Sequence, residues 1–503
     1  MCWTQLSNSV WVPLLLSIAG CSSPETCEDD DCAESQAVRG CVGFLEPGPD
    51  ETCVARAWPP EQRHRLAEPG ADDLEVSVDG LGRALVSWRR RHPDPAQSLS
   101  RLAEQTADGW AVHSLGSPAR GFGSRATLAT LGLEAWVSWT QHRTDESGAD
   151  ESTVHLLRRD DTGQWLSSDI GEQVSALPKA YEPRPVLVPT GEGFLVWNQW
   201  LSKGGYGVAV ARRGPGGPLN LPHAPDDVIS PQVFFSNAPQ LAAATNGDAL
   251  VTWYQATPPP GSTSNDPVSD GLRLFVSERT GAAGHFSKPA IDDWLSPLGP
   301  PLASHEIRNP VVAIGEFGQA LVFWSQQHPS GAVGLYAASR TGKRRWTTPH
   351  DIDDTFGPLR EFATCIDVAI SPTREAHVTW FDGPPGATQV YAAHHDNAGQ
   401  WDVPRTQALS TAGRTAQDPR LAVGPDGEVA LVWSERGEDG RWRVMGRRRG
   451  PNAVHWSAAV ELSVPEEGDA IGPVVAIGPD GTLAAAWTVG PLGFQTVSVS
   501  TLP

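Results

Sequence analysis

A short phrase that reads as two strands joined by a tight turn recurs along this chain. Its clearest copy is Asp418–Arg436, DPRLAVGPDGEVALVWSER, in which two apolar runs flank a GPDG turn and the second run reaches a tryptophan. The eight copies reach Trp88, Trp139, Trp197, Trp253, Trp324, Trp380, Trp433 and Trp487. Neighbouring tryptophans are 51 residues apart at the closest (Trp88 to Trp139) and 71 at the widest (Trp253 to Trp324). Short strands repeated at such a period are typical of β-propellers, so the sequence predicts an all-β fold with a single eight-bladed β-propeller over residues 57–503.

Each unit is expected to form a blade of four antiparallel strands. After the tryptophan strand comes a third apolar run, such as Val390–His395, and then a turn that contains glycine. A fourth strand follows and opens with an aromatic residue, as at Trp401. Alternating apolar residues separated by glycine-rich turns are typical of antiparallel sheets.

The eighth unit has room for only three strands, because Phe494–Ser500 is the last apolar run before the chain stops at Pro503. A possible fourth strand stands at the other end of the chain. Ala57–Ala67, AWPPEQRHRLA, begins like the other fourth strands with a tryptophan followed by proline. Proline is tolerated on an outermost strand, and an unpaired edge invites aggregation. We therefore predict that residues 57–67 form the outer strand of the last blade and close the ring.

The chain begins with a segment that has the features of an export signal. The apolar run Val10–Ala19 is too short to cross a membrane. The run Ile18–Cys21 resembles the bacterial lipobox, which implies cleavage before Cys21 and lipidation of that residue. We expect residues 1–20 to be a lipoprotein signal peptide and the protein to be anchored in the bacterial cell envelope. Ser22, in place of aspartate, favours the outer membrane.

Residues 21–56 are acidic and poor in apolar side chains, so we expect a lipidated, cysteine-rich tether rather than a domain with a core. Four cysteines stand close together in this segment: Cys27, Cys32, Cys41 and Cys53. An even set behind an export signal predicts two disulfides in an oxidising compartment, in any of three pairings.

The formal net charge of −21 argues against nucleic acid as a partner, because phosphate binding needs a basic surface. It also argues against adhesion to an anionic membrane through protein charge. We expect a monomer that contacts the membrane through its lipid anchor only.

Two sets of equivalent positions are candidates for a ligand site. The first lies two residues past each tryptophan and holds the polar residues Arg90, Gln141, Gln199, Gln255, Gln326, Asp382 and Glu435. The second precedes the first strand of a unit and includes Arg184, Asn309 and Asp418. Both sets should ring one mouth of the central channel, because these loops share one face. Polar residues at strand ends also satisfy loop backbone groups, and that reading stays open.

No sequence motif for a zinc site, a phosphate loop or a dinucleotide fold stands in a fitting context, so we expect no cofactor and no metal. Ca²⁺ is the one ion to consider, because carboxylate oxygens are its preferred ligands. Paired acids recur at Asp72-Asp73, Asp226-Asp227, Asp292-Asp293 and Asp353-Asp354. A solvated acidic rim is the favoured explanation, because neither EF-hand nor repeat Ca²⁺ spacing is present.

The turns between third and fourth strands, such as HHDNAGQW (His394–Trp401) and RRDDTGQW (Arg158–Trp165), resemble degenerate Asp-boxes of sialidase-like propellers. For a sialidase the resemblance implies an arginine triad, a Tyr/Glu nucleophile pair and an aspartic acid. Tyr181-Glu182 is the only adjacent Tyr/Glu pair in the chain, and no Arg-Ile-Pro segment opens the first blade.

Three functions follow from these features. The first is an envelope lipoprotein that binds a glycan or a protein through the loop face without catalysis. The second is a divergent glycoside hydrolase of sialidase type, which needs two carboxylates that flank a sugar bond. The third is an assembly scaffold of the outer membrane, by analogy of architecture.

Overall fold

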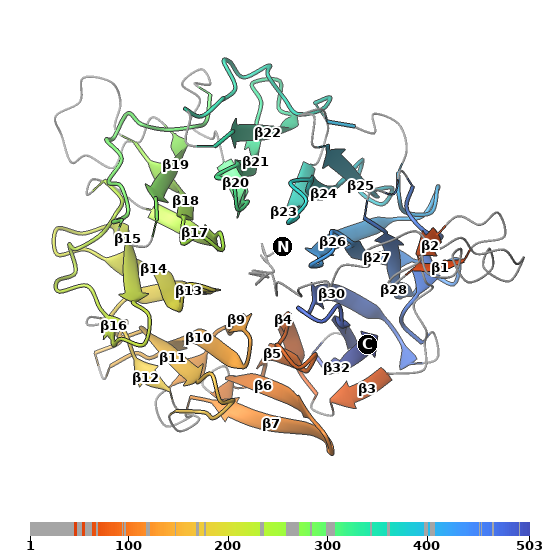
Figure 1. The fold of residues 1–503 in the computed structure, drawn as a ribbon, viewed down its shortest axis with the longest axis horizontal. Helices are drawn as coiled ribbons and strands as arrows, with labels where there is room; N and C mark the ends of the chain where they lie inside the picture. Colours follow the sequence, from red (N-terminus) through yellow and green to blue (C-terminus); the bar gives the residue numbers. More distant parts are fainter. Residues whose placement is uncertain are drawn as a thin grey trace, which may run out of the picture.

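The computed structural model is an eight-bladed β-propeller, as predicted (Figure 1). It describes residues 63–502 apart from short internal gaps, the longest of which are 258–270 and 298–306, and a separate hairpin of β1 (Leu45–Pro47) and β2 (Cys53–Ala55). The leader, Cys21, Cys27, Cys32, Cys41 and Trp58 lie outside the described residues. The described part contains no helix that could cross a membrane.

Each blade is an antiparallel sheet whose first strand lies nearest the axis and whose later strands lie farther out (Figure 1). Blade one is β4 (Ala71–Val78), β5 (Ala84–Arg90), β6 (Leu99–Thr106) and β7 (Gly109–Leu115). Blade two is β8 (Phe122–Gly123), β9 (Thr127–Leu131), β10 (Glu134–His142), β11 (Thr153–Arg159) and β12 (Glu172–Gln173). Blade three is β13 (Ala180–Val188), β14 (Glu192–Trp200), β15 (Tyr206–Arg213) and β16 (Leu219–Asn220). Blade four is β17 (Ser236–Ala243), β18 (Ala249–Ala256) and β19 (Leu272–Arg279).

Blade five is β20 (Ile307–Ile314), β21 (Ala320–Gln327) and β22 (Val333–Arg340). Blade six is β23 (Ala363–Ile370), β24 (Ala376–Asp382) and β25 (Gln389–His395). Blade seven is β26 (Ala416–Val423), β27 (Val429–Arg436), β28 (Trp442–Arg449) and β29 (Val460–Glu461). Blade eight is β30 (Ala470–Ile477), β31 (Leu483–Val489), β32 (Thr496–Leu502) and β3 (Arg63–Leu66). In blades four to six the outer strand is a single bridge, at Phe275–Trp294, Ser339–Thr347 and His395–Trp401.

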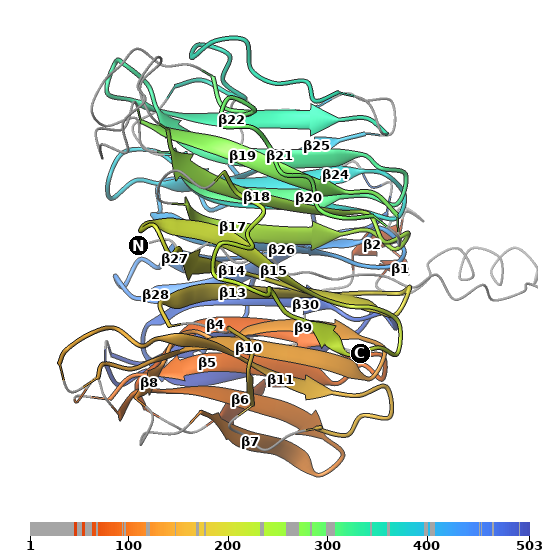
Figure 2. The ribbon, with the colours of Figure 1, turned by 90° about the vertical axis from the view of Figure 1, so that its left-hand side faces the viewer.

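The strands run between two faces of the molecule (Figure 2). We call the face where each first strand begins and each second strand ends the loop face. The opposite face carries the tight turns between first and second strands, and we call it the turn face. Antiparallel pairing puts all the units in the same orientation, so equivalent residues form rings around the axis.

The ring closes as the sequence predicted. Strand β3, from the beginning of the chain, pairs with β32, from its end, with Arg63 opposite Ser500 and Leu66 opposite Val497. Leu66 is buried in a cluster that also contains Trp88 of blade one and Val474 and Val499 of blade eight. The outer strand therefore both covers the edge of the last blade and contributes to the core that joins the last blade to the first.

The repeated tryptophans fill the spaces between the blades. Seven of the eight are at most 1% exposed, and Trp380 is 7% exposed. In three consecutive blades the tryptophan ring stacks on an aromatic residue of the third strand: Trp253 on Phe275, Trp324 on Tyr336 and Trp380 on Tyr391. Burial of one such side chain contributes about 1.5–3 kcal/mol or more, so the repeat that defines the sequence also supplies much of the core.

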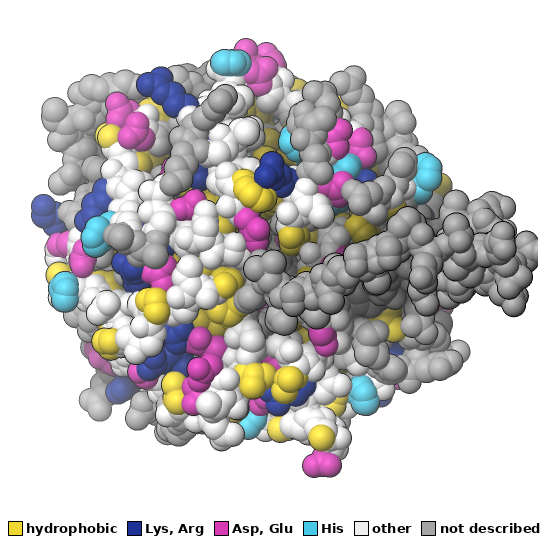
Figure 3. Space-filling model, viewed as in Figure 1, with side chains coloured by type: hydrophobic (Ala, Val, Ile, Leu, Met, Phe, Trp, Pro, Cys, Tyr) yellow, Lys and Arg dark blue, Asp and Glu magenta, His cyan; other side chains and the backbone are white. Residues whose placement is uncertain are grey.

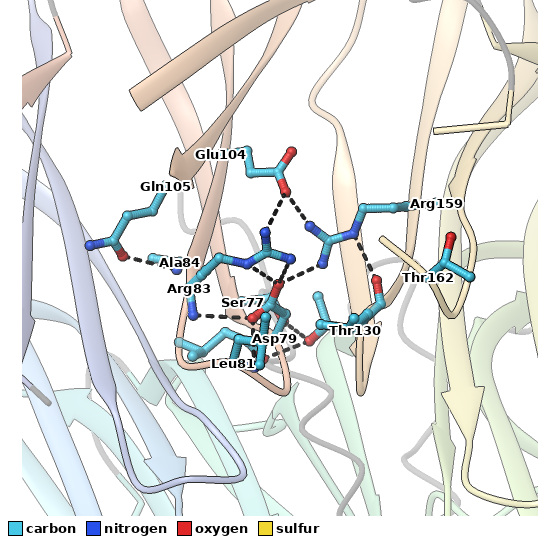
Figure 4. A network of polar contacts seen from close by, with 12 residues as sticks. Ser77, Asp79, Leu81, Arg83, Ala84, Glu104, Gln105, Thr130, Arg159 and Thr162 are labelled. Atoms are coloured by element: carbon cyan, nitrogen blue, oxygen red, sulfur yellow. Dashed lines mark hydrogen bonds and ion pairs between the residues drawn. The ribbon is translucent and has the colours of Figure 1, made fainter. Parts of the chain in front are cut away.

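Arginines at the end of the third strand tie blades to their neighbours. In blade two the buried Arg159 donates to Asp79 Oδ2 of blade one at 2.8 Å and to the carbonyl of Leu133 at 2.8 Å, and it pairs with Glu104 (Figure 4). Trp165 Nε1 donates to the other oxygen of Glu104 at 3.1 Å. This arrangement, which we call the arginine clasp, joins two blades through one buried guanidinium.

The clasp recurs around the ring with different carboxylates. Arg213 pairs with Glu134, Arg279 with Glu192 at 2.8 Å, and Arg340 with Glu278. Each of these arginines ends its third strand, and each carboxylate belongs to the preceding blade. A buried ion pair is costly to break once formed, so these contacts fix which blades are neighbours.

Removal of the closing strand should destabilise the propeller. A chain that lacks residues 22–56 keeps β3 and should unfold like the full chain. A chain that lacks residues 22–68 loses β3 and exposes the edge of β32, so it should melt at a lower temperature and aggregate. Thermal unfolding and light scattering of the two truncations measure this, and equal behaviour would contradict the closure.

Removal of a clasp arginine should be costly. Arg159→Met removes the buried cation of the clasp and leaves Asp79 and Glu104 with only the partly exposed Arg83, so the free energy of unfolding should fall by up to about 3–5 kcal/mol in urea denaturation. The matched control is Arg158→Met, because Arg158 pairs with Glu172, whose side chain is 43% exposed, and should lose at most about 1 kcal/mol. Similar losses in the two variants would show that the clasp does not stabilise the ring.

Candidate functional site

The innermost strands share a bulge near the loop face. In seven of them the register shifts at a residue with positive φ: Asp73 (52°), Glu182 (56°), Ala238 (50°), Asn309 (51°), Cys365 (52°), Asp418 (54°) and Gly472 (61°). The left-handed conformation is unfavourable for residues other than glycine, at a cost of order 1–3 kcal/mol each. A bulge changes the direction of the side chains that follow it. Repeated strain of this kind around one mouth marks the axis as the candidate site.

In the third unit, the sequence repeats align Arg184 with Asn309 and Asp418. The structure corrects this alignment by two residues, because the bulge residue of β13 is Glu182. A signal in the sequence could have set the register, because most of these residues are followed by proline, as in Glu182-Pro183 and Asp418-Pro419.

Charged side chains converge on the axis just below the bulges. Two positions after each bulge residue stand Glu75, Arg184, Gln240, Val311, Asp367, Arg420 and Val474. We call the five charged residues Glu75, Arg125, Arg184, Asp367 and Arg420 the axial ring; Arg125 joins it from the break between β8 and β9.

Contacts across the ring show how close these groups come. Glu75 Oε2 lies 3.3 Å from Arg125 Nη2 and 4.0 Å from Arg184 Nη1. Blades one and three are not neighbours, so this second contact shows that the side chains meet near the axis. The charges of Arg125 and Glu75 also act on Arg420 of blade seven. The ring therefore presents guanidinium donors and carboxylate acceptors side by side.

Burial shifts the proton equilibria of the axial ring. It raises the pKa of Asp367 to about 7, although Arg420 and the backbone amides of Leu421 and Val368 favour the carboxylate. Burial also raises the pKa of Glu75, which Arg125 and Arg184 oppose. The pKa of Arg184 falls to about 10, through burial and then the charge of Arg125. Asp367 is thus the acidic group of the ring that titrates near neutral pH.

Glu182 stands at the mouth of the ring and is exposed. Its Oε2 accepts hydrogen bonds from Asn198 Nδ2 at 3.0 Å and from the backbone amide of Ala238 at 3.2 Å. Burial, and then the Glu182 carboxylate, raise the pKa of Tyr254 to about 12. Glu182 and Tyr254 come from adjacent blades, so the fold makes a Tyr/Glu neighbourhood that the chain order does not show.

The predicted glutamines are buried beside the tryptophans. Gln199, Gln255 and Gln326 are 4%, 0% and 0% exposed. Each accepts a hydrogen bond from the indole of the tryptophan two residues before it, at 3.1–3.2 Å. Gln255 also donates to the carbonyl of Pro231 at 2.9 Å. These bonds give the glutamines a structural role, while the predicted ligand contact stays untested.

The other predicted residues lie in varied surroundings. Glu435 is buried and accepts from Trp433 Nε1 at 3.1 Å and from the amide of Thr411 at 2.9 Å. Gln141 and Asp382 are buried at the ends of β10 and β24, and Arg90 is half-buried at the end of β5. At the mouth, Asn309 donates to Thr364 Oγ1 of the next blade at 2.7 Å. Asp418 is half-buried, and burial raises its pKa.

The paired acids considered for Ca²⁺ accept hydrogen bonds in their loops. Asp72 binds the guanidinium of Arg89, with an N–O distance of 2.7 Å. Asp293 and Asp354 accept from backbone amides at 3.0 and 2.8 Å. Within the described residues, these pairs are loop acceptors rather than a cluster of oxygen ligands.

The comparisons with known proteins give distant similarities in structure. No protein-family model matches the chain, and no curated protein sequence matches it. Among solved structures, the polysaccharide lyase Uly1 is 12% identical with a TM-score of 0.44, over 88% of this chain and 99% of that one. The Trypanosoma rangeli sialidase in complex with DANA is 10% identical with a TM-score of 0.37, over 91% of this chain and 57% of that one. The α-L-arabinanase of Penicillium chrysogenum is 13% identical with a TM-score of 0.38, over 88% and 95%. Similarities this distant say nothing of what the chain binds.

The pH dependence of stability should report on Asp367. Its folded-state pKa of about 7 lies above the ordinary aspartate value of 3.8, so the native state binds the extra proton. This contribution is full at low pH and is lost as the pH rises through about 7. Each pKa unit corresponds to about 1.4 kcal/mol, so the wild type should lose a few kcal/mol between pH 4 and pH 8.

The variant Asp367→Asn cannot titrate, so its free energy of unfolding should not show this decline. Urea denaturation across the pH range measures both proteins. Asp351→Asn, at an exposed aspartate, is the control and should follow the wild type. Parallel curves for wild type and Asp367→Asn would contradict the raised pKa.

Proposed function

We propose that the protein is an exported, lipid-anchored β-propeller that binds a glycan on the loop face, at the axis, without catalysis. The observation that carries this proposal is the axial ring with Glu182 at its mouth. Sugar hydroxyls donate and accept hydrogen bonds, and the ring offers guanidinium donors next to carboxylate acceptors. A bare anion is a poorer match, because Glu75 already contacts both Arg125 and Arg184, and the carboxyl groups of Glu75, Asp367 and Glu182 are as many as the ring's arginines.

The charges of the axial ring support a ligand held by hydrogen bonds rather than by a field of one sign. Acidic and basic side chains alternate there, since Glu75 lies between Arg125 and Arg184. Figure 3 shows the opposite, turn face, where acidic and basic side chains are likewise interspersed among uncharged ones. Long-range steering of a charged ligand needs a surface of one sign, whereas hydrogen bonds to hydroxyl groups do not. A neutral or weakly charged carbohydrate therefore suits the axial ring better than a polyanion.

Hydrolysis of a glycosidic bond is the second candidate, and Asp367 is the observation that favours it. A carboxyl group with a pKa near 7 is suited to act as a general acid. Glu182 and Tyr254 are neighbours of the type that the sialidase resemblance implies for a nucleophile. The raised pKa of Tyr254 weakens that role, because it keeps the phenol protonated. We therefore place binding before catalysis.

A glycan array with the wild type and two variants tests the proposal. We expect the wild type to retain a restricted set of glycans. Glu182→Gln should weaken binding at least tenfold with an unchanged melting temperature, because Glu182 is exposed and such changes alter stability by about 0.5 kcal/mol. Gln255→Ala should lower the melting temperature and leave the affinity of the folded protein unchanged. If Gln255→Ala instead weakens binding at constant stability, the glutamine ring is the ligand site.

Chromogenic glycosides tested in parallel separate the two candidates. Turnover by the wild type that disappears in Asp367→Asn would establish the hydrolase. No turnover together with retained glycans supports binding alone. A wild type that neither retains nor hydrolyses any glycan would contradict both.

The anchor is a separate part of the proposal and rests on the sequence Ile18–Cys21. Wild type should sediment with membranes and incorporate labelled fatty acid, whereas Cys21→Ser should be soluble. Each buried CH₂ of an acyl chain contributes about 0.8 kcal/mol, so loss of the chains should release the protein. A Cys21→Ser protein that still sediments, with no label in the wild type, would contradict lipidation.

A further inference from the structure

Three side chains that can ligate a metal ion gather in blade six near the turn face, away from the axial ring. Glu375 immediately precedes β24, His377 lies on β24 and His394 lies on β25. One ligand atom from each residue lies within 4.8 Å of the others. Glu375 Oε1 is 3.5 Å from His394 Nε2, and Glu375 Oε2 is 3.9 Å from His377 Nε2.

The pairing of the two strands brings the histidines together. His377 and His394 are direct register partners, and their rings stack with centroids 5.0 Å apart. They are 17 positions apart in the chain (377 to 394), so the spacing alone does not reveal the pair. The adjacent His395 faces the other side of β25, where it contacts Trp401.

His377 is an unusual residue for its position. It is 2% exposed, and neither ring nitrogen has a hydrogen-bond partner among the described residues. Equivalent positions in blades one, four and five hold Leu85, Leu250 and Leu321. A buried polar group without a partner costs about 1–3 kcal/mol, so packing alone would favour leucine here as well.

The arginine clasp of this interface has a histidine at one of its two carboxylate positions. Blades one and four present Glu104 and Glu278 to the arginine of the next blade, and blade six presents His394 at that position. At the other position, which is Glu134 in blade two and Glu192 in blade three, blade six keeps Glu375, whose charge acts on Arg449. Arg449 Nη2 of blade seven lies 3.2 Å from His394 Nδ1, and its Nε donates to the carbonyl of Ala453. The interface between blades six and seven is therefore built from different chemistry at this point.

We propose that Glu375, His377 and His394 bind a divalent transition-metal ion of the zinc class. Two imidazole nitrogens and one carboxylate oxygen suit zinc, whereas Ca²⁺ and Mg²⁺ prefer oxygen ligands alone. Ligand bonds of about 2.0–2.1 Å in a tetrahedron put ligand atoms about 3.4 Å apart. The separations of 3.5 and 3.9 Å involve different oxygens of Glu375, and the three ligand atoms lie within 4.8 Å of one another, so binding requires side-chain movements of about 1–1.5 Å.

Asp402 completes the arrangement around His394. Its Oδ2 is 3.7 Å from His394 Nδ1, so a metal on Nε2 leaves Nδ1 with a hydrogen that Asp402 can accept. A carboxylate behind a ligating histidine is common in zinc sites and fixes the tautomer. The contact from Arg449 to Nδ1 must then open, and the positive charge of Arg449 opposes the ion.

Metal titration of the full chain, without a histidine tag and after chelator treatment, tests the site. The wild type should bind one equivalent of Zn²⁺ by calorimetry, and its melting temperature should rise with Zn²⁺. Co²⁺ should give visible absorption without thiolate charge transfer. In a triple variant, each proposed ligand is replaced by the residue that blade five has at the equivalent position. The changes are Glu375→Gln, His377→Leu and His394→Ser, after Gln319, Leu321 and Ser339. The variant should fold and lose both responses.

Further variants keep the test decisive. His142→Gln changes a histidine of blade two and should bind Zn²⁺ like the wild type. Arg449→Gln removes the opposing charge and should bind Zn²⁺ several-fold more tightly. If the triple variant does not fold, the single His394→Ser change decides, and it should weaken binding at least tenfold. The inference fails if the wild type binds no Zn²⁺ or if its Co²⁺ complex shows thiolate ligation. It also fails if the triple variant binds Zn²⁺ as tightly as the wild type. Where the triple variant does not fold, the same holds for His394→Ser.

Discussion

The pairing of β3 with β32 is the contact on which the rest of the propeller depends. Each inner blade is held by packing on both faces, and the first and last blades obtain the second face only when the ring closes. Leu66 of β3 shares a buried cluster with Trp88 of blade one and with Val474 and Val499 of blade eight. The outer strand thus links the two ends of the chain through side chains as well as through backbone hydrogen bonds.

A closed ring also explains how the chain tolerates strain at the axis. Asp73, Asn309 and Asp418 adopt the left-handed conformation at non-glycine positions, a local cost that the tryptophan packing farther out can offset. The bulges hold the residues that follow at fixed positions, so Glu75, Arg184, Asp367 and Arg420 meet without mobile loops. Such preorganisation lowers the entropic cost of binding, because the side chains of the site are already ordered before the ligand arrives.

The sequence predicted the fold well, because the tryptophan repeat is itself the packing unit. It also predicted the closure, since the incomplete eighth unit and the segment before the first unit each lacked a partner. The sequence says less about the candidate site, and the predicted ligand contacts stay predictions. Gln255 lies near the end of β18, but its side chain shares a strand face with Trp253 and bonds to the indole, which a pattern of polar letters does not reveal. Asp367 and Arg420 were missed because they stand inside apolar runs, where only the bulge shows that they face the axis.

The closing strand has a consequence for the order in which the molecule can form. Arg65 of β3 donates to Thr496 of β32 at 3.0 Å, across 431 residues of chain. A ribosome or a translocation channel delivers β3 first and β32 last, so β3 must wait for its partner while seven other blades are made. Contacts between such distant residues slow folding, and an exposed strand edge in the interval invites association between chains. This interval makes protection of an unfinished ring as important as the stability of the finished one.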